Sequence, residues 1–324
     1  MRSGLPYFNS LQGARAIAVL AVVACHLNAS LSQLYGFDSR VLASGWNGVY
    51  FFFVLSGFLI ARRLFVDGAT SNLKNYFKRR LQRTWPAYFA VMLVLIVCGV
   101  RFEPNLWSYL TFTQNFFEPV TFLPSWTLAA EEQFYLLAPF LVLLFARTGL
   151  TSLLALIAVV VGVRYALNPG RTLLVAIDSL VMGCGIAFLE IRKPAWLDRL
   201  KVRPMMLTVV GLAIVYLPIV WRWGLSEAAT WLFFAQGIGF SLVLIALLNP
   251  SFVLSRVLSS RPFFEMGRVS YSIYLVHVFA IAIAQGFQLA ILPFVLASLA
   301  LTAVLTLALY FSIEKRFLNS RQGS

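Results

Sequence analysis

Residues 91–100 (VMLVLIVCGV) and 153–163 (LLALIAVVVGV) are apolar on every face of any helix or strand that they could form. They lack the alternation of lipid-facing apolar and lumen-facing polar residues that marks the strands of a membrane β-barrel. In a bilayer every backbone N–H and C=O group must pair within the protein, and a continuous helix does this inside one segment. These stretches therefore predict transmembrane helices.

The composition of the whole chain agrees with this interpretation. Of its 324 residues 60% are hydrophobic and only 12% are charged, and the mean hydropathy is +0.83. An ordinary soluble domain carries about 25% charged residues, so this chain cannot cover itself with a solvated surface. The same balance excludes intrinsic disorder, which needs low hydrophobicity.

Apolar stretches long enough to cross a bilayer recur along the whole chain. We expect an all-α integral membrane protein, with residues 1–324 forming one domain and one bundle of about ten transmembrane helices. The expected spans are 12–30, 46–64, 84–102, 128–146, 150–166, 172–189, 205–222, 229–248, 268–286 and 290–312.

The basic residues lie in alternate loops. The chain carries 26 Lys and Arg against 12 Asp and Glu, a net charge of +14. Such an excess can indicate nucleic acid, but in a chain this apolar it indicates basic loops, and we expect no nucleic-acid partner. The loops on one side, together with both ends of the chain, hold 21 of the 26 basic residues. Because positive charge is retained in the cytoplasm, we expect both termini there.

The three cysteines do not form a pattern with a chemical function. Cys25, Cys98 and Cys184 all lie in apolar stretches and include no CxxC pair. We therefore expect neither a disulfide scaffold nor a bound metal.

The first expected span carries two ionisable residues, Arg15 and His26. Such groups are costly inside a bilayer, by roughly 2.5–3.5 kcal/mol on insertion scales, so each is a candidate for function. They are eleven residues apart, which is about three helical turns and about 16 Å along one face. Arg15 could instead be an interfacial anchor, and His26 a hydrogen-bonded core residue.

A polar strip occupies the expected span 268–286. Ser270, Tyr274 and His277 follow the i, i+4, i+7 spacing and share one helix face. A polar strip on a membrane helix faces the bundle interior or water. The alternative interpretation is hydrogen bonding that holds helices together.

Acidic residues are scarce in the spans. Glu131 and Glu132 lie at the start of the span 128–146, where acids also favour the helix dipole. Neighbours on a helix point about 100° apart, so we expect only one of the two to face a site. Asp178 is a further intramembrane acid whose partner the sequence does not identify.

The expected loop 62–83 is the most basic segment, with seven Lys and Arg against a single Asp67. Arg80 and Arg83 lie three residues apart, just before Pro86. One explanation of these basic residues is the rule that cytoplasmic loops carry positive charge, or a contact with anionic membrane lipids. The functional interpretation is a phosphate clamp, because guanidinium groups match phosphate oxygens.

Five segments together resemble the acyltransferase family 3 membrane proteins, and they occur in the order that the family shows. They are LQGARAIAVLAVVACH (11–26), NGVYFFFVLSGFLI (47–60), FKRRLQRTWPAY (77–88), WTLAAEEQFYL (126–136) and GRVSYSIYLVH (267–277). The family's hallmark, an arginine followed after ten residues by a histidine, falls on Arg15 and His26. The family's paired arginines match Arg80 and Arg83, and its glutamate matches Glu131.

The sequence departs from the family pattern at three places. Gln12 stands where an aspartate is usual, and Tyr50 stands where the family has the last residue of Gly-Val-Asp. The family's terminal Glu-Arg-Pro appears as Glu314-Lys315-Arg316. None of these changes touches Arg15 or His26, but Tyr50 leaves the role of its loop open.

The resemblance implies a bacterial inner-membrane enzyme that moves an acyl group from acyl-CoA, commonly acetyl-CoA, to a hydroxyl of a surface polysaccharide, lipopolysaccharide or lipid-linked glycan. His26 would be the general base, Glu131 would orient it, and Arg15, Arg80 and Arg83 would bind the donor. A covalent acyl-histidine stays open. Further candidates for substrate contacts are Trp126, Ser270, Tyr274 and His277.

A second class of function remains open. His26, Glu131, Asp178 and His277 could form the proton relay of a transporter for an acyl or glycan-like solute. Transporters are commonly built from repeats with broken helices at matching positions, and the sequence shows no internal repeat. A purely structural membrane scaffold would leave these polar residues unexplained.

Overall fold

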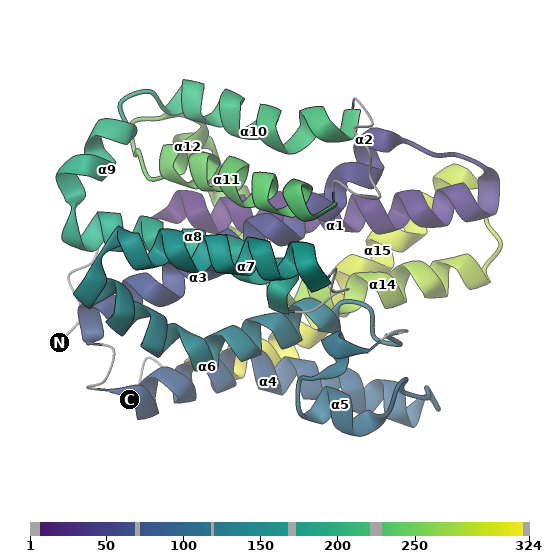
Figure 1. Cartoon of the computed structure of the whole chain (residues 1–324). Helices are drawn as coiled ribbons and strands as arrows, with labels where there is room; N and C mark the ends of the chain where they lie inside the picture. The colour runs from purple at the N-terminus through teal and green to yellow at the C-terminus, as the bar shows by residue number, and fades with distance from the viewer. Residues whose placement is uncertain (1–6, 69–71, 118–119, 168–172, 221–228, 320–324) are drawn as a thin grey trace.

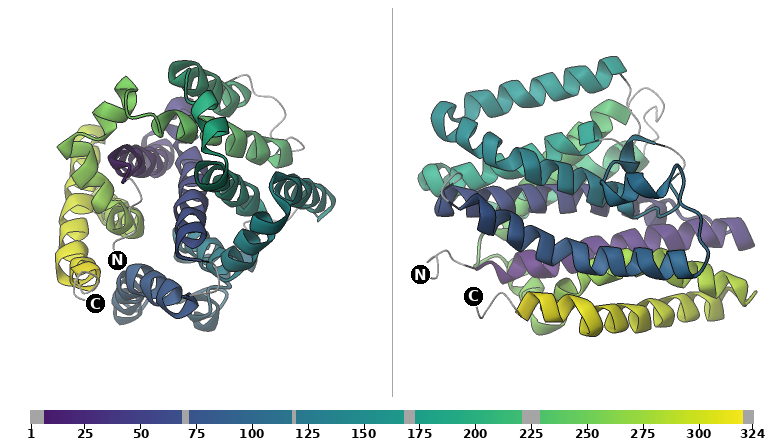
Figure 2. Two further views of the ribbon diagram at one scale, coloured as in Figure 1. Left: turned by 90° about the vertical axis from the view of Figure 1, so that its left-hand side faces the viewer. Right: turned by 90° about the horizontal axis from the view of Figure 1, so that it is seen from below.

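The structure is a computed structural model that describes residues 7–68, 72–117, 120–167, 173–220 and 229–319. Within these ranges every regular element is a helix. The long helices lie side by side in one bundle (Figures 1 and 2). They are α1 (Asn9–Tyr35), α3 (Gly48–Asp67), α4 (Leu73–Val97), α6 (Ser125–Thr148), α7 (Leu150–Leu167), α8 (Leu173–Arg192), α10 (Pro204–Val220), α11 (Ala229–Leu247), α14 (Ser270–Gly286) and α15 (Ile291–Leu309).

Shorter helices connect these long ones. They are α2 (Arg40–Ala43), η1 (Ser44–Asn47), α5 (Leu106–Leu110), η2 (Gln114–Phe116), α9 (Pro194–Leu200), α12 (Val253–Leu258), α13 (Arg261–Arg268), η3 (Tyr310–Glu314) and α16 (Lys315–Asn319). Figure 1 shows α1 beginning and the last helix ending at one end of the bundle, whereas α2 and α5 lie at the other end. This arrangement fits an even number of crossings.

Each predicted span coincides with one long helix, but fewer helices meet a strict test for crossing a membrane. Among the described residues four segments are long and apolar enough: Asn9–Tyr35, Arg40–Asp67, Ser125–Thr148 and Ile291–Phe317. The number rises to six if α9 with α10, bent by 78°, and α13 with α14, bent by 69°, each count as one span. Over the described residues the protein is therefore all-helical, with four to six candidate spans, and the count of ten stays a prediction.

Helix α3 forms the centre of the bundle and packs closely on α8, because both helices carry a glycine at the crossing. A Cβ atom on Gly57 would lie 1.9 Å from the carbonyl oxygen of Leu180, and one on Gly183 would lie 2.2 Å from that of Val54. Only residues without a side chain permit such backbone contact, which is the small-residue packing that membrane helices favour. Helix α3 also packs on α1 and α6, so these three helices position the polar residues described below.

The basic segment before Pro86 is helical, and the prediction of a loop over 62–83 was wrong for most of its length. Helix α3 extends to Asp67, and α4 begins at Leu73 and continues through Pro86. Lys and Arg are good helix formers, so charge alone does not end a helix. The hydroxyl of Thr84 donates to the carbonyl oxygen of Arg80 at 3.1 Å. Arg80 therefore lies within helix α4, six residues before the proline.

Asp178 has a partner that the sequence did not identify. Its Oδ2 lies 2.5 Å from Nη2 of Arg164, and the two side chains are 0% and 1% exposed. The pair joins α7 to α8 inside the bundle. Among the described residues Asp178 is therefore bound by Arg164, and not by the histidines that the transporter hypothesis would connect to it.

Candidate active site

Each residue of the polar strip on α14, which is Ser270, Tyr274 and His277, contacts one residue of α1 or α6. The Arg15 guanidinium donates from Nε to the Ser270 hydroxyl at 3.4 Å. The Tyr274 and Thr127 hydroxyls share a hydrogen bond of 2.7 Å. The His277 ring lies against the His26 ring, with Nε2 and Nδ1 3.1 Å apart. The strip therefore runs from the Arg15 level of α1 to the His26 level.

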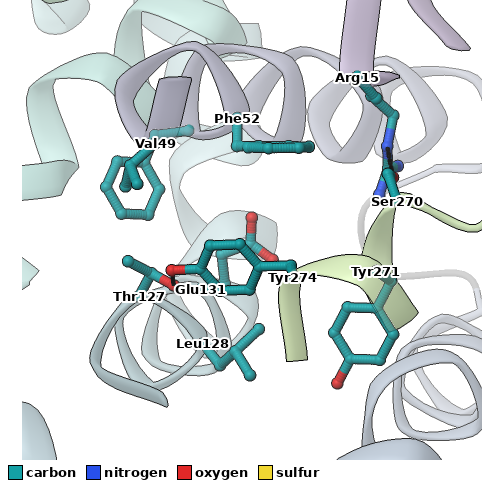
Figure 3. Close-up of a pocket in the computed structure, with 10 residues that line it drawn as sticks. Arg15, Val49, Phe52, Thr127, Leu128, Glu131, Ser270, Tyr271 and Tyr274 are labelled. Carbon is teal, nitrogen blue, oxygen red and sulfur yellow. Dashed lines mark hydrogen bonds between the residues drawn. The ribbon is translucent and has the colours of Figure 1, made fainter. Parts of the chain in front are cut away.

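Four of the residues predicted for the site line one small inner cavity (Figure 3). The cavity has a volume of about 50 Å³ and lies between α1, α3, α6 and α14. Figure 3 shows Arg15 beside Ser270 and the Tyr274 hydroxyl beside Thr127. The lining is Arg15, Val49, Phe52, Phe53, Thr127, Leu128, Glu131, Ser270, Tyr271 and Tyr274.

The two neighbouring glutamates of α6 point to different helices. Glu131 lines the inner cavity and accepts hydrogen bonds from the hydroxyls of Ser56 at 2.5 Å and Tyr135 at 3.0 Å. Glu132 instead accepts from the Thr84 hydroxyl at 2.6 Å and the Trp85 indole at 3.3 Å, both on α4. The expectation that only one of the pair faces the cavity therefore agrees with the geometry.

One of the partners at Nδ1 of His26 is a second histidine, His277. The centroids of the His26 and His277 rings lie 4.9 Å apart, with an angle of 60° between the ring planes. His277 is fully buried, whereas His26 is half-buried. The family resemblance gives the orienting role to Glu131, and this role stays a prediction, while in the structure His277 lies beside Nδ1 of His26. Glu131 lies in the cavity that Arg15 lines.

A second and larger cavity lies next to the inner one, toward the end of the bundle where α1 begins. Its volume is about 440 Å³, and six arginines line it. Arg15 borders both cavities, so its guanidinium lies at their boundary. The lining is Tyr7, Phe8, Leu11, Gln12, Arg15, Leu59, Arg62, Arg63, Tyr76, Arg79, Arg80 and Arg83, and we refer to this space as the basic cavity.

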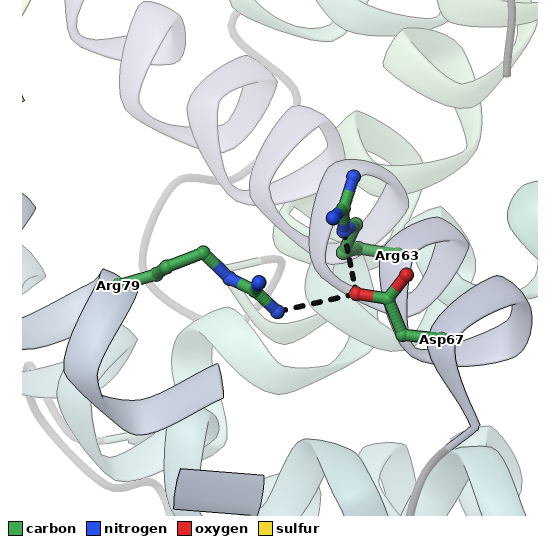
Figure 4. A network of polar contacts seen from close by, with 3 residues as sticks. All are labelled: Arg63, Asp67 and Arg79. Atoms are coloured by element: carbon green, nitrogen blue, oxygen red, sulfur yellow. Dashed lines mark hydrogen bonds and ion pairs between the residues drawn. The ribbon is translucent and has the colours of Figure 1, made fainter. Parts of the chain in front are cut away.

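Acidic neighbours neutralise part of this positive charge. Arg62 pairs with Glu190 at 2.6 Å. Asp67 accepts from Arg63 at 2.6 Å and from Arg79 at 3.1 Å, so one carboxylate serves two arginines (Figure 4). These contacts fix the direction in which the three guanidinium groups point.

Arg80 and Arg83 differ from the other arginines of the basic cavity. Within the part of the chain that the structure describes, neither forms an ion pair with a carboxylate. The Arg80 guanidinium lies over the aromatic rings of Tyr76 and Tyr135, 5.9 and 5.4 Å from their centroids. Aromatic faces orient a cation without neutralising it. The basic cavity therefore keeps positive charge that is available to an anion.

One predicted residue, Trp126, lies outside the lining of the inner cavity, and some residues around that cavity were not predicted from the sequence. Trp126 packs against Phe53, with ring centroids 6.1 Å apart, and it is the next residue, Thr127, that lines the inner cavity. Thr127 and Tyr135 lie four residues before and after Glu131, and this spacing could have identified both as members of the same helix face. No local signal indicated Ser56, which reaches Glu131 from another helix.

Comparison with known proteins finds relatives that are named O-acetyltransferases. The chain is 29% identical to the peptidoglycan O-acetyltransferase OatA of Listeria monocytogenes serovar 1/2a, over 84% of this chain and 49% of that protein. It is 26% identical to the O-acetyltransferase OatA of Staphylococcus aureus strain NCTC 8325, over 84% of this chain and 50% of that protein. The chain thus spans about half the length of these relatives. No solved structure matches it.

The match to a protein family covers nearly the whole chain. The sequence model described as "Acyltransferase domain" matches residues 8–313, from the start of α1 to η3. This range includes every residue of the two cavities except Tyr7, and both histidines. The chain therefore belongs to the acyltransferase 3 family of membrane proteins.

Proposed function

We propose that the protein is a membrane-embedded O-acyltransferase that moves an acetyl group from cytoplasmic acetyl-CoA to a hydroxyl of a cell-envelope glycan. One observation carries this proposal. The basic cavity holds two arginines that have no acidic partner among the described residues, and it meets at Arg15 a polar inner cavity. Tyr274, which lines the inner cavity, packs against His277. A polyanionic donor with a long arm and a reactive end matches such an arrangement.

The donor's charged end fits the basic cavity. Coenzyme A carries a pyrophosphate and a 3′-phosphate, and guanidinium groups bind phosphate oxygens through paired hydrogen bonds. Arg80 and Arg83 supply charge that no carboxylate neutralises among the described residues. The pantetheine arm would pass Arg15, which lies about 16 Å along α1 from the level of His26. Coenzyme A is made in the cytoplasm, where basic loops remain.

His26 is the proposed general base. Its imidazole takes the proton from the acceptor hydroxyl, and the hydroxyl oxygen attacks the thioester carbonyl carbon. The C–S bond then breaks, the acyl group stays on the oxygen as an ester, and the coenzyme A thiolate takes up a proton. General-base catalysis of this kind contributes about 10²–10⁴-fold in rate. Arg15, which donates to Ser270, and Glu131 both line the inner cavity. There the two side chains would position the arm of the donor.

The inner cavity must widen when the donor enters. Its volume of about 50 Å³ is small beside ligand pockets, which commonly measure about 300–1,000 Å³. Phe52 and Tyr274 are two of the large side chains that line this space, with ring centroids 6.4 Å apart (Figure 3). Their movement would open a path from the basic cavity to the histidines.

The chemical class of the acceptor is inferred from the names of the relatives. The Listeria protein is named for the O-acetylation of peptidoglycan, so a glycan hydroxyl is the acceptor that we propose here. Incubation of the purified protein with labelled acetyl-CoA and extracted cell-envelope glycan tests this. Label should appear in base-labile esters on the glycan. Consumption of acetyl-CoA without label in any glycan, or no consumption at all, would refute the proposal.

A further inference from the structure

We propose that His277 is a positioning residue that fixes the tautomer of His26 and so selects Nε2 of His26 as the basic atom. This inference rests on the proposed function, because it concerns the atom that takes the acceptor's proton. It follows from the hydrogen-bond partners of the two rings and from the chemistry of backbone carbonyls, which accept hydrogen bonds and never donate them.

The tautomer of His277 is set by its own helix. Its Nδ1 lies 3.1 Å from the carbonyl oxygen of Ile273 and 2.8 Å from that of Tyr274. Both partners are acceptors, so Nδ1 of His277 must carry the hydrogen. The ring is fully buried, and its hydrogen-bond partners in the described part of the chain include no carboxylate, so a neutral ring is far less costly there than a charged one. In the neutral ring Nε2 then holds the lone pair and can only accept.

The tautomer of His26 follows from that of His277. Nδ1 of His26 lies 3.1 Å from Nε2 of His277 and 3.0 Å from the carbonyl oxygen of Val22. Both neighbours accept, so Nδ1 of His26 must be the donor, with one hydrogen shared between them. The lone pair of the neutral His26 ring is therefore on Nε2. An isolated histidine side chain favours the opposite tautomer, so this arrangement has to be imposed by partners.

The consequence concerns catalysis. When Nε2 of His26 takes the proton of the acceptor hydroxyl, the ring becomes an imidazolium whose Nδ1–H still donates to His277 and Val22. The same two acceptors therefore hold the ring before and after proton transfer, without a rotation. In serine-protease triads an aspartate performs this orienting task. Here a neutral imidazole does so, which avoids placing a second buried charge beside the base.

The chain allows a direct test, because His26 and His277 are its only histidines. Protein labelled with ¹⁵N in histidine and carrying a tag without histidine gives four ring-nitrogen signals in magnetic resonance spectra. We expect both rings to show a protonated Nδ1 and an unprotonated Nε2. A wild-type His26 ring with the hydrogen on Nε2 would refute the proposal, whatever the activity of the protein.

Two variants of His277 separate positioning from packing. His277→Met has a similar volume but no acceptor, and His277→Gln places an amide oxygen where Nε2 was. We expect His277→Met to lose the Nδ1–H signal of His26 and about 100-fold in kcat, with the KM for acetyl-CoA and the melting temperature little changed. His277→Gln should restore the signal and at least a tenth of the activity.

The outcomes also distinguish this inference from the proposed function. Unchanged kcat in His277→Met, beside an inactive His26→Ala, would refute positioning and leave the general base in place. A fall in melting temperature without a change in the His26 signal would mean that His277 serves packing alone, and it would likewise refute the proposal. If no protein transfers acetyl groups, the proposed function fails, and the spectra still decide the tautomer.

Discussion

Replacing Arg80 or Arg83 with alanine should weaken donor binding, and the neighbouring Arg79 provides a matched control. All three line the basic cavity from α4, but Arg79 is already bound to Asp67, which Arg63 also holds (Figure 4). Arg80 and Arg83 have no such partner among the described residues. Binding of the donor's phosphates should therefore depend on Arg80 and Arg83, and much less on Arg79.

The size of the effect follows from the burial of these side chains. A hydrogen bond between charged groups contributes about 1.5–3 kcal/mol, and partial exposure of both arginines to solvent favours the lower half of this range. Since every 1.4 kcal/mol is about tenfold in Kd, each alanine variant should raise the Kd for acetyl-CoA by about 10–30-fold. Arg79→Ala should raise it by less than about threefold.

Calorimetric titration of the detergent-purified proteins measures this directly. Coenzyme A and free pantetheine serve as paired ligands, because only the former carries the phosphates. The variants should lose affinity for coenzyme A and keep that for pantetheine, and added salt should weaken coenzyme A binding in the wild type. Unchanged affinity in both Arg80→Ala and Arg83→Ala, or an equal loss in Arg79→Ala, would refute the assignment of the basic cavity to the donor.

Three further predictions follow. His26→Ala should fold and insert normally but lose acyl transfer by about 10²–10⁴-fold, and retention of more than a tenth of the turnover would contradict its role as general base. Glu131→Gln should lower turnover, because Glu131 lines the inner cavity, whereas Glu132→Gln should leave turnover nearly unchanged; rates for both variants decide this, and the reverse order would contradict it. Asp178→Asn leaves the buried charge of Arg164 without its partner and should destabilise the protein by about 3–5 kcal/mol in a thermal unfolding assay, and an unchanged melting temperature would contradict a structural ion pair.

Much of the fold was visible in the sequence because a bilayer restricts the choice of structure. Apolar stretches predicted helices at the places where the long helices lie, and their limits differ mainly at α4. At α4 the basic residues before Pro86 suggested a loop, because basic residues are concentrated in the cytoplasmic loops of membrane proteins. The structure shows three turns of helix, because Lys and Arg do not disfavour helical backbone.

Some features of the candidate site follow from residue spacing within one helix, whereas others depend on contacts between helices that are far apart in the sequence. Helical spacing placed Arg15 and His26 on one face and Ser270, Tyr274 and His277 on another, and these are the faces that meet. The pairing of the two histidines depends on the packing of α1 against α14, which lie about 250 residues apart in the chain and leave no local signal. The sequence therefore did not indicate that His277 lies beside His26, and the orienting role that we propose for His277 follows from the fold alone.

The distribution of charge in the basic cavity was likewise beyond the sequence. A count of seven basic residues against one acid predicts a positive field over 62–83 but not which arginines are neutralised. Asp67 binds Arg63 within the same helix turn and Arg79 across the connection to α4, while Glu190 reaches Arg62 from α8. Only the fold separates these three from Arg80 and Arg83.

The central claim is that an acetyl group enters from the donor at the end of the bundle that carries both termini and leaves on a glycan at the other side. Vesicles that contain the purified protein in one known orientation test it, with labelled acetyl-CoA supplied only on the side of the termini and a glycan acceptor only on the opposite side. The account predicts labelled ester on the glycan under this arrangement and none when donor and acceptor exchange sides. Transfer only when both substrates share one side of the membrane would contradict it.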